Sequence, residues 1–405
     1  MTTPFSPDGF LDHWMRFLPQ MPGMGTPAQE HAETEDESEE HASLVTIRDF
    51  APNPGGLRMR ALVPDNLPQG APLVVLLHGC RQTAAEYLLG SGWGTLAERH
   101  GFALLLPEQR RLNNPNLCFN WFETGDIARG AGEAGSIAAM IHTIVARHGL
   151  DPKRVYITGL SAGGAMANAM LAAYPELFAG GAIIAGLPYG SAASAHEAFG
   201  VMGQGRVRSG EELGARVREA SAYPGPWAPV TLWQGEADPV VNPVNVAELA
   251  KQWVDVLGLG DVAPEQTRRD GVERLVWRDA EGGAVLTLYR IADLGHAVPI
   301  NPTAALPDAR IGHLGASAFI QEAPISSTWQ IAEGWGLVTP DHAAGTALPP
   351  PPPHHTESAG FWHHLPGADR MEHFARELAG DNTPLGKLLR AGGITPPGGT
   401  PPEGR

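Results

Sequence analysis

Short apolar runs separated by stretches with helical spacing dominate the chain from about residue 44 to residue 335. The runs at 72–79 and 102–107 are almost continuously apolar, which is typical of strands buried on both faces of a parallel sheet. Further strands are expected at 44–50, 57–64, 154–159, 180–186, 230–235 and 284–291, and helices at 84–100, 135–148, 161–173, 244–256 and 326–335. This alternation predicts an α/β fold with a mostly parallel central sheet and helices on both faces.

The two ends of the chain differ from this central region. Residues 1–42 combine an acidic linker at 30–41 with an amphipathic helix at 8–18, whose apolar positions are Phe10, Leu11, Trp14, Met15 and Leu18. That helix either packs on the main domain or acts as an adhesive arm for an apolar surface. Residues 43–340 are predicted to form one large domain, and residues 341–405 a Pro-rich, largely disordered tail.

Composition narrows the range of partners. A formal net charge of -16 and the lack of a Lys/Arg-rich face argue against nucleic acid, because its phosphates would be repelled. No apolar run reaches the roughly 18 to 20 residues that span a bilayer, so we expect no transmembrane helix. Residues 1–25 lack a basic segment followed by an uninterrupted apolar stretch and do not read as a signal peptide. The oligomeric state is left open.

A candidate nucleophile lies in the pentapeptide Gly159-Leu160-Ser161-Ala162-Gly163. It falls between a predicted strand at 154–159 and an Ala-rich helix, which is the context of a sharp strand-to-helix turn that exposes a serine hydroxyl above the sheet. The helix N-terminus at this point favours developing negative charge. Ser161 is therefore the predicted nucleophile.

A serine hydroxyl needs a base, and the base needs an orienting carboxylate. In the order serine, acid, histidine, the loops after two later strands supply Asp238 and His296. Asp293 and Glu236 are alternative acids, and His313 is an alternative base. We favour His296 because Gly295 before it lets the backbone turn and bring the imidazole back towards the serine.

An acyl-transfer site also needs amide donors for the carbonyl oxygen that becomes negatively charged. The residue after the nucleophile, Ala162, supplies one candidate, and Cys80, directly after the strand at 72–79, supplies the other. Cys80 and Cys118, the two cysteines of the chain, both fall on loops at the carboxyl ends of neighbouring predicted strands. A disulfide between them is possible, with two free buried thiols as the alternative.

Two further residue groups have simple competing explanations. The aromatic residues Phe119, Trp121 and Phe122 either line a groove for an apolar ester chain or pack in the core, and Trp121 and Phe122 are our candidates for substrate binding. Histidines 354, 355, 363 and 364 resemble metal ligands by composition alone, since they lack a framework at closed-site spacing. We expect neither a metal nor a cofactor.

The joined motifs resemble one known family. LVVLLHGCRQTAAEY, GFALLLPEQ, NPNLCFNWFETGD, DPKRVYITGLSAGGAMANAM and AGLPYG are similar to the poly(3-hydroxybutyrate) depolymerase-like esterases, a family related to feruloyl and acetylxylan esterases. The resemblance covers roughly residues 44–337. It implies that residues 43–340 form an α/β-hydrolase catalytic domain with a Ser161, Asp238, His296 triad and oxyanion donors at Cys80 and Ala162.

These observations together predict a serine esterase that hydrolyses short-chain hydroxyalkanoate esters, as polymer, oligomer or small ester, through an acyl-enzyme intermediate. A feruloyl or acetylxylan-type carbohydrate esterase is the alternative with the same triad. A non-catalytic binding protein on a hydrolase scaffold is the alternative of another class, although all three members of the triad are present. The resemblance implies an extracellular location, whereas the lack of a readable signal peptide favours a cytoplasmic one.

Overall fold

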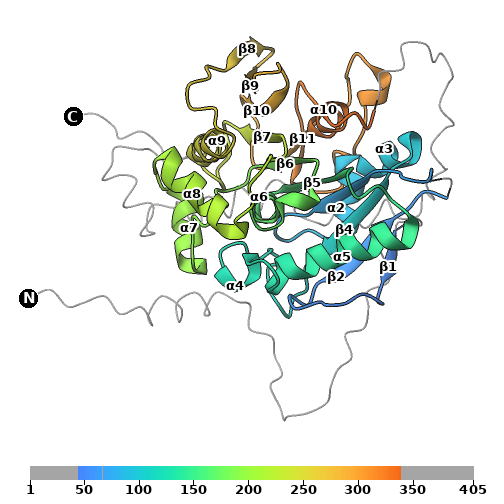
Figure 1. Cartoon of the computed structure of the whole chain (residues 1–405). Coiled ribbons are helices and arrows are strands. Elements are labelled where there is room, and N and C mark those ends of the chain that lie inside the picture. Colours follow the sequence, from blue (N-terminus) through green and yellow to red (C-terminus); the bar gives the residue numbers. More distant parts are fainter. Residues whose placement is uncertain (1–43, 66, 339–405) are drawn as a thin grey trace, which may run out of the picture. The chain divides into compact units, whose positions relative to one another are not determined.

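A ten-stranded sheet lies at the centre of the structure, a computed structural model that describes residues 44–65 and 67–338 (Figure 1). Its six central strands are parallel, and two antiparallel strands extend each edge. The order across the sheet is β1 (Val45–Ile47), β2 (Arg58–Leu62), β4 (Ala103–Glu108), β3 (Leu73–Leu77), β5 (Val155–Leu160), β6 (Gly180–Ile184), β7 (Val230–Gly235), β10 (Ala284–Ile291), β9 (Val272–Arg278) and β8 (Glu265–Arg269).

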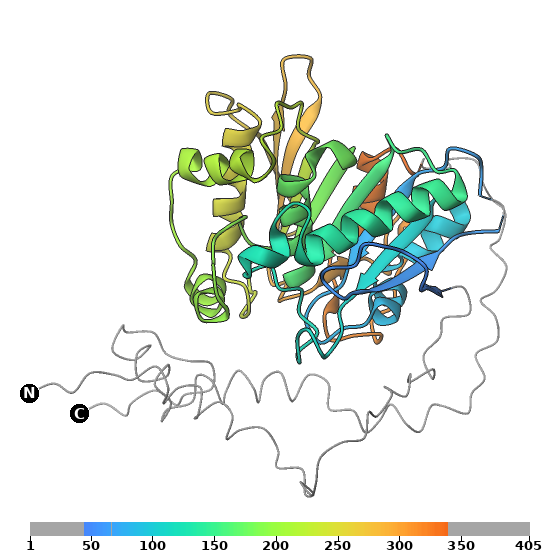
Figure 2. The ribbon, with the colours of Figure 1, turned by 60° about the horizontal axis from the view of Figure 1, so that its bottom comes forward.

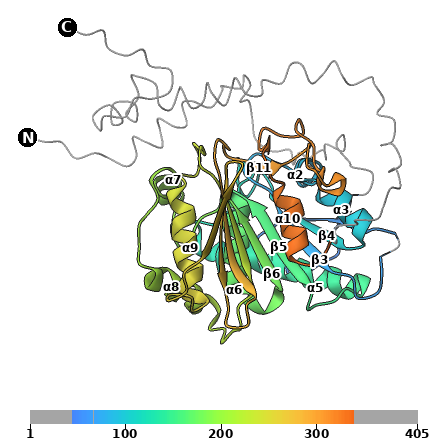
Figure 3. The same ribbon diagram turned by 90° about the horizontal axis from the view of Figure 1, so that it is seen from above.

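Helices cover both faces of this sheet (Figure 3). One face packs on α5 (Gly132–His148), α6 (Ala162–Ala173), α8 (Gly210–Ser221) and α9 (Val244–Val256), and Figure 2 shows α5 lying across the strands. The other face packs on α2 (Ala84–Ser91), α3 (Trp93–His100) and α10 (Ser327–Gly334). Every residue of β3 is buried because its side chains alternate between these two cores, as expected for a parallel sheet covered on both sides. The predicted α/β architecture is confirmed.

The predicted helix at 84–100 is two helices, and the prediction of one continuous helix was wrong. Gly92 separates α2 from α3 because it adopts a left-handed backbone conformation with a φ of 81°. The backbone of a distant loop passes close by, so that a Cβ built on Gly92 would lie 2.5 Å from the Gly312 nitrogen. A glycine at this position lets the two segments pack against each other.

Several elements were not anticipated from the sequence. They are the hairpin of β8 and β9, the short parallel pair β11 (Val298–Ile300) and β12 (Ile320–Glu322), and the helices α4 (Thr124–Ile127), α7 (Ala195–Gln204) and α8. All five residues of β8 are exposed, so this strand has no apolar position that could have indicated it. Its pairing with β9 comes from backbone hydrogen bonds at the edge of the sheet rather than from burial.

The carboxyl ends of β3, β5, β7 and β10 lie at the same edge of the sheet, because these strands belong to its parallel part. The loops that carry the candidate site residues begin there, which is where ligands bind in open α/β sheets. The helix expected at 8–18, the acidic linker at 30–41 and the Pro-rich tail lie outside the described residues. Within the described residues, no helix is long and apolar enough to cross a membrane.

The first turn of α2, directly after the loop that contains Cys80, is held by a capping box. The Thr83 hydroxyl accepts a hydrogen bond from the Glu86 N–H at 3.2 Å, and the Glu86 carboxylate accepts one from the Thr83 N–H at 2.8 Å. Replacing Thr83 by alanine should lower the free energy of unfolding by about 1 kcal/mol, because one helix N–H loses its acceptor. Urea unfolding measures this loss. Thr83→Ser keeps the hydroxyl and should match the wild type, so equal losses in both variants would contradict the capping role.

Candidate active site

Ser161 lies at the junction of β5 and α6 with a φ of 59° and a ψ of -119°. Residues other than glycine rarely adopt a positive φ, because the conformation costs about 1 to 3 kcal/mol and persists only where the surroundings enforce it. Here the Ser161 N–H donates to the Ile184 carbonyl at 2.9 Å, and the Ser161 carbonyl accepts from the Ala165 N–H at 2.8 Å. Both sides of the residue are therefore held, and the serine is fixed at the N-terminal end of α6.

Glycine at position 163 brings α6 against the end of β3. A Cβ built on Gly163 would lie 2.2 Å from the Leu77 carbonyl oxygen and 2.5 Å from the His78 carbonyl oxygen. No larger residue fits without moving one of these backbones. The nucleophile turn and the loop that follows β3 are consequently in direct backbone contact.

Asp238 and His296 form a buried pair. The His296 Nδ1 lies 2.8 Å from Asp238 Oδ2, and the two residues are 4% and 6% exposed, respectively. The second carboxylate oxygen accepts from the N–H groups of Val240 and Val241 at 2.8 and 2.9 Å, and Gln234 Nε2 donates to Oδ2 at 3.1 Å. All of these backbone and amide partners are donors, which suits an acceptor-only carboxylate. A carboxylate at Nδ1 places the ring proton there and leaves Nε2 as the basic nitrogen.

The loops of Asp238 and His296 are also joined through their backbones. The N–H groups of Glu236 and Ala237 donate to the carbonyls of Ile291 and Leu294 at 2.9 and 3.0 Å. A Cβ on Gly235 would lie 2.3 Å from the Leu294 oxygen, so this contact also requires glycine. The acid and the histidine are therefore positioned as one unit.

The alternative acids and the alternative base from the sequence do not belong to this buried pair. Glu236 is exposed and pairs with Arg290 at 2.7 Å. Asp293 and His313 are exposed, and His313 donates its backbone N–H to the Gly90 carbonyl at 3.0 Å. Among the acids considered, the structure brings Asp238 to His296.

The two candidate oxyanion donors lie at the ends of adjacent strands. Ala162 is the first residue of α6, where a helix N–H has no intrahelical acceptor. Cys80 follows Gly79, and a Cβ built on Gly79 would lie 3.5 Å from the carbonyl oxygen of Leu160, the residue before Ser161. Within the described residues, neither the Cys80 N–H nor the Ala162 N–H has a protein acceptor. The position of these two N–H groups beside Ser161 is compatible with the predicted oxyanion hole.

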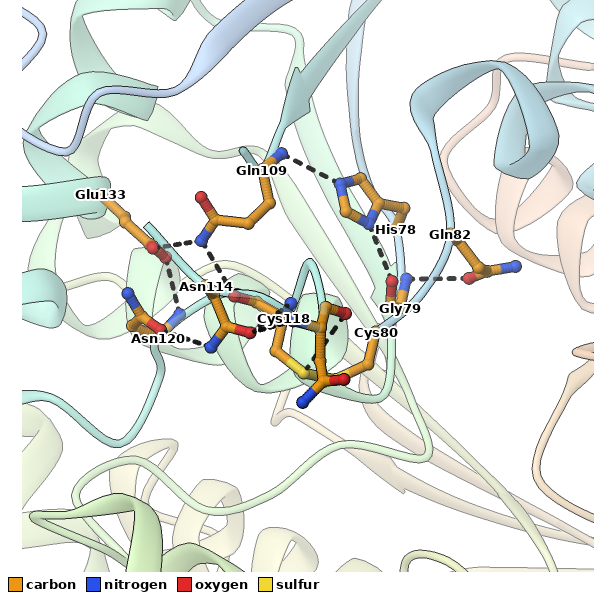
Figure 4. The surroundings of a disulfide bond; sticks show 10 residues. His78, Gly79, Cys80, Gln82, Gln109, Asn114, Cys118, Asn120 and Glu133 are labelled. Carbon is orange, nitrogen blue, oxygen red and sulfur yellow. Dashed lines mark hydrogen bonds between the residues drawn. A yellow bond between two sulfur atoms is a disulfide. The ribbon is translucent and has the colours of Figure 1, made fainter. Parts of the chain in front are cut away.

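Cys80 and Cys118 are joined by a disulfide with a Cα–Cα distance of 4.2 Å (Figure 4). The bond ties the loop after β3 to the loop after β4. Asn114 organises the second loop, because its Oδ1 accepts from the Asn116 and Cys118 N–H groups at 3.0 and 3.3 Å. The Cys118 carbonyl in turn accepts from Gln109 Nε2 at 2.9 Å. The disulfide thus connects the candidate oxyanion loop to a neighbouring loop that is held by its own hydrogen bonds.

A buried carboxyl group, that of Glu133, accepts hydrogen bonds from this second loop. The Glu133 oxygens accept hydrogen bonds from the Gln109 side chain and from the Asn120 N–H, the latter at 2.8 Å (Figure 4). Burial and the nearby Asp126 carboxylate raise the pKa of Glu133 to about 8, although both hydrogen bonds act in the opposite direction. Glu133 therefore helps to order the loop between β4 and α5 from a position inside the protein.

The three aromatic residues of the same loop have different surroundings. Phe119 is fully buried and packs on the His78 ring with a centroid distance of 4.9 Å. Trp121 is 6% exposed and lies in a small apolar cluster, with Phe122 partly buried against it. The buried members of this cluster are Trp121, Ala162, Ala165, Leu187, Ala192, Ala198, Val201 and Val241. Since Ala162 follows Ser161 in the sequence, this cluster, called the apolar wall below, lies next to the nucleophile turn, whereas Phe119 belongs to the core.

Some residues that shape the site were not singled out from the sequence. Gln234 is the last residue but one of the buried strand β7, and a polar side chain at such a position is the signal that could have indicated it. Gln82 accepts from the Gly79 N–H at 2.9 Å, but nothing in the sequence pattern marks it. Within the described residues no group of His, Cys, Asp and Glu side chains could hold a metal ion, and the four tail histidines lie outside these residues.

One edge of the parallel sheet carries a serine at a strand-to-helix turn, a buried histidine–carboxylate pair and two amides without a protein acceptor. This arrangement is typical of the α/β-hydrolase class of serine hydrolases. Comparison with known proteins supports the same class. The chain belongs to the esterase PHB depolymerase family, whose model matches residues 60–276. The predicted family and the predicted carboxylic ester hydrolase activity are confirmed.

Individual relatives are esterases and depolymerases. Poly(3-hydroxyalkanoate) depolymerase C of Paucimonas lemoignei is 39% identical over 297 residues, which cover 73% of this chain and 70% of that protein. Acetylxylan esterase A of Aspergillus ficuum is 33% identical over 64% of this chain and 86% of its own length. Feruloyl esterase B of Talaromyces funiculosus is 29% identical over 65% and 76%, respectively. Among solved structures, an acetyl xylan esterase from Aspergillus awamori matches with a TM-score of 0.61 and 25% identity, over 73% of this chain and 100% of that chain.

The disulfide between Cys80 and Cys118 closes a loop with a sequence separation of 38 residues. Loop-closure entropy predicts that it stabilises the fold by about 4 kcal/mol, because it restricts the unfolded chain. A Cys80→Ala/Cys118→Ala variant should lose about this much in urea unfolding, and dithiothreitol should lower the stability of the wild type towards that of the variant. The double variant itself should not respond to the reductant. Wild-type stability that is unchanged after complete reduction would contradict the prediction.

Proposed function

We propose that this esterase hydrolyses short-chain hydroxyalkanoate esters through an acyl-enzyme intermediate formed on Ser161. The observation that carries the assignment of roles is the 2.8 Å contact between His296 Nδ1 and Asp238 Oδ2, located at the same sheet edge as Ser161. Asp238 holds the imidazole with its Nδ1 protonated, so Nε2 acts as the general base.

The reaction proceeds in two similar steps. Ser161 Oγ attacks the ester carbonyl carbon while its proton passes to His296 Nε2, and the carbonyl oxygen becomes negatively charged between the N–H groups of Cys80 and Ala162. The C–O bond then breaks, the leaving alcohol takes the proton from His296, and the acyl group remains on Ser161. Water repeats the attack, which releases the acid and restores the serine.

The substrate assignment rests on the apolar wall and on the relatives. Trp121 and Phe122 lie in the cluster that includes Ala162, where an apolar acyl or alcohol chain attached to the reacting carbonyl can pack. A poly(3-hydroxyalkanoate) depolymerase is 39% identical to this chain, above the 33% and 29% of the acetylxylan and feruloyl esterases. A feruloyl or acetylxylan-type carbohydrate esterase is the second candidate function, because the solved structure of an acetyl xylan esterase matches 73% of the chain.

A substrate panel separates the two candidates. Purified protein should hydrolyse 3-hydroxybutyrate dimers and trimers with a kcat/KM at least about tenfold above that for feruloyl sugars and acetylated xylo-oligosaccharides. The reason is that packing against an apolar wall stabilises the transition state by about 1 to 3 kcal/mol per apolar group. Replacing Trp121 by alanine should reduce this preference. A higher kcat/KM for the carbohydrate esters would establish the second candidate instead.

The catalytic roles are tested with two substitutions and two matched controls. Ser161→Ala should lower kcat by about 10⁴ to 10⁶-fold, and Asp238→Asn by about 10⁴-fold, because the histidine then takes the wrong tautomer. Asp293→Asn and Glu236→Gln are matched controls that should remain near wild-type activity, since both side chains are exposed. Initial rates on a soluble ester and labelling by a fluorophosphonate give the readouts. A large loss in either control, or labelling of Ser161→Ala, would refute the assignment.

A further inference from the structure

The peptide unit between Gly79 and Cys80 carries the N–H proposed to bind the oxyanion. A trans peptide is planar, so its C=O and N–H point in opposite directions, and fixing the direction of one fixes the other. The Gly79 carbonyl accepts a hydrogen bond from His78 Nδ1 at 2.8 Å and a longer one from the Gln82 N–H at 3.3 Å. The side chain of His78 therefore helps to set the direction of the Cys80 N–H.

The tautomer of His78 follows from its two partners (Figure 4). The Gln109 N–H donates to His78 Nε2 at 3.1 Å, so this nitrogen carries the lone pair. The Gly79 carbonyl can only accept, so Nδ1 carries the proton. A doubly protonated ring would place one N–H against another at Gln109. Burial likewise lowers the pKa of His78, which keeps the ring neutral, against smaller opposing contributions from the Gly79 hydrogen bond and from Glu108.

The ring has little freedom to turn. His78 is 1% exposed, and Phe119 packs on it. The residue that holds its Nε2 is itself fixed, because the side chain of Gln109 donates to Glu133 and to the Cys118 carbonyl. Two elements, β3 with its loop and the loop after β4, thus converge on one imidazole.

We infer that His78 is a positioning residue for the oxyanion hole: its Nδ1–H holds the Gly79–Cys80 peptide so that the Cys80 N–H points at the reacting carbonyl oxygen. This inference rests on the proposed roles of Ser161 and Cys80. The hydrogen bond to the Gly79 carbonyl also polarises the peptide, which strengthens its N–H as a donor. The benefit is largest when the substrate oxygen becomes negatively charged, so it acts on kcat rather than on substrate binding.

Two amide substitutions separate the two ring nitrogens. In His78→Asn the side-chain NH₂ takes the place of Nδ1 and can still donate to the Gly79 carbonyl, while the acceptor for Gln109 is lost. In His78→Gln the side-chain oxygen reaches the place of Nε2 and can still accept from Gln109, while the donor to Gly79 is lost. Each variant removes one hydrogen bond, so both should lose similar stability in urea unfolding.

The catalytic rates should differ between the two variants. On a soluble ester, His78→Gln should lose about 10²-fold in kcat with KM within about twofold of wild type, whereas His78→Asn should keep kcat within about fivefold. His78→Leu, which keeps apolar packing on Phe119 and carries neither nitrogen, is a third variant and should lose kcat as His78→Gln does. Equal rates in the Asn and Gln variants, or a larger loss in His78→Asn, would overturn the inference. Wild-type kcat in His78→Leu would overturn it as well.

The wild type and Ser161→Ala, assayed alongside, keep this result distinct from a failure of the proposed function. If the wild type does not cleave esters, or if Ser161→Ala is fully active, the proposed function fails. If ester cleavage depends on Ser161 but His78→Asn and His78→Gln behave alike, the positioning role alone fails. Titration of free thiols in each variant verifies that the Cys80–Cys118 bond has formed, so that its loss cannot account for a lower rate.

Discussion

The close contact between Gly163 and the carbonyl oxygens of Leu77 and His78 is the constraint on which the rest of the site depends. It sets how near the first turn of α6 lies to the end of β3, and so how near the Ala162 amide lies to the loop of Cys80. Gly235 plays the same part where the loop of Asp238 meets the loop of His296. Close backbone packing at these two glycines therefore fixes the relative positions of the loops that carry the serine, the histidine and the carboxylate.

The buried polar groups of the site are matched donor to acceptor. Asp238 accepts from the His296 ring, from the Gln234 amide and from two backbone N–H groups. His78 donates through one nitrogen and accepts through the other. Burying such groups without partners would cost several kcal/mol each, so the matching is a condition for placing them inside the protein. It also restricts each buried imidazole to one tautomer, whereas a solvent-exposed histidine could adopt both.

Much of this arrangement could be predicted from local pattern. The parallel core follows from the continuous apolar runs of β3 and β4, and the position of Ser161 follows from small residues at a strand-to-helix junction. The break at Gly92 could not be predicted, because it depends on a loop more than 200 residues away in sequence that passes close to it. The partners of Gln234 and His78 could not be predicted either, because only the folded chain brings them together. The exposed strand β8 was missed because edge pairing needs no apolar side chains.

The bond between Cys80 and Cys118 also changes the connectivity of the polypeptide. Together with the chain from residue 80 to residue 118, it forms a closed covalent ring that contains α2, α3 and β4. Leu112 and its neighbours before Cys118 form an exposed part of that ring. A single cut by a protease there would open the ring without dividing the molecule, because the two new ends would still belong to one covalently linked unit. The segment that carries the proposed oxyanion donor would thus stay attached to the rest of the sheet after such a cut.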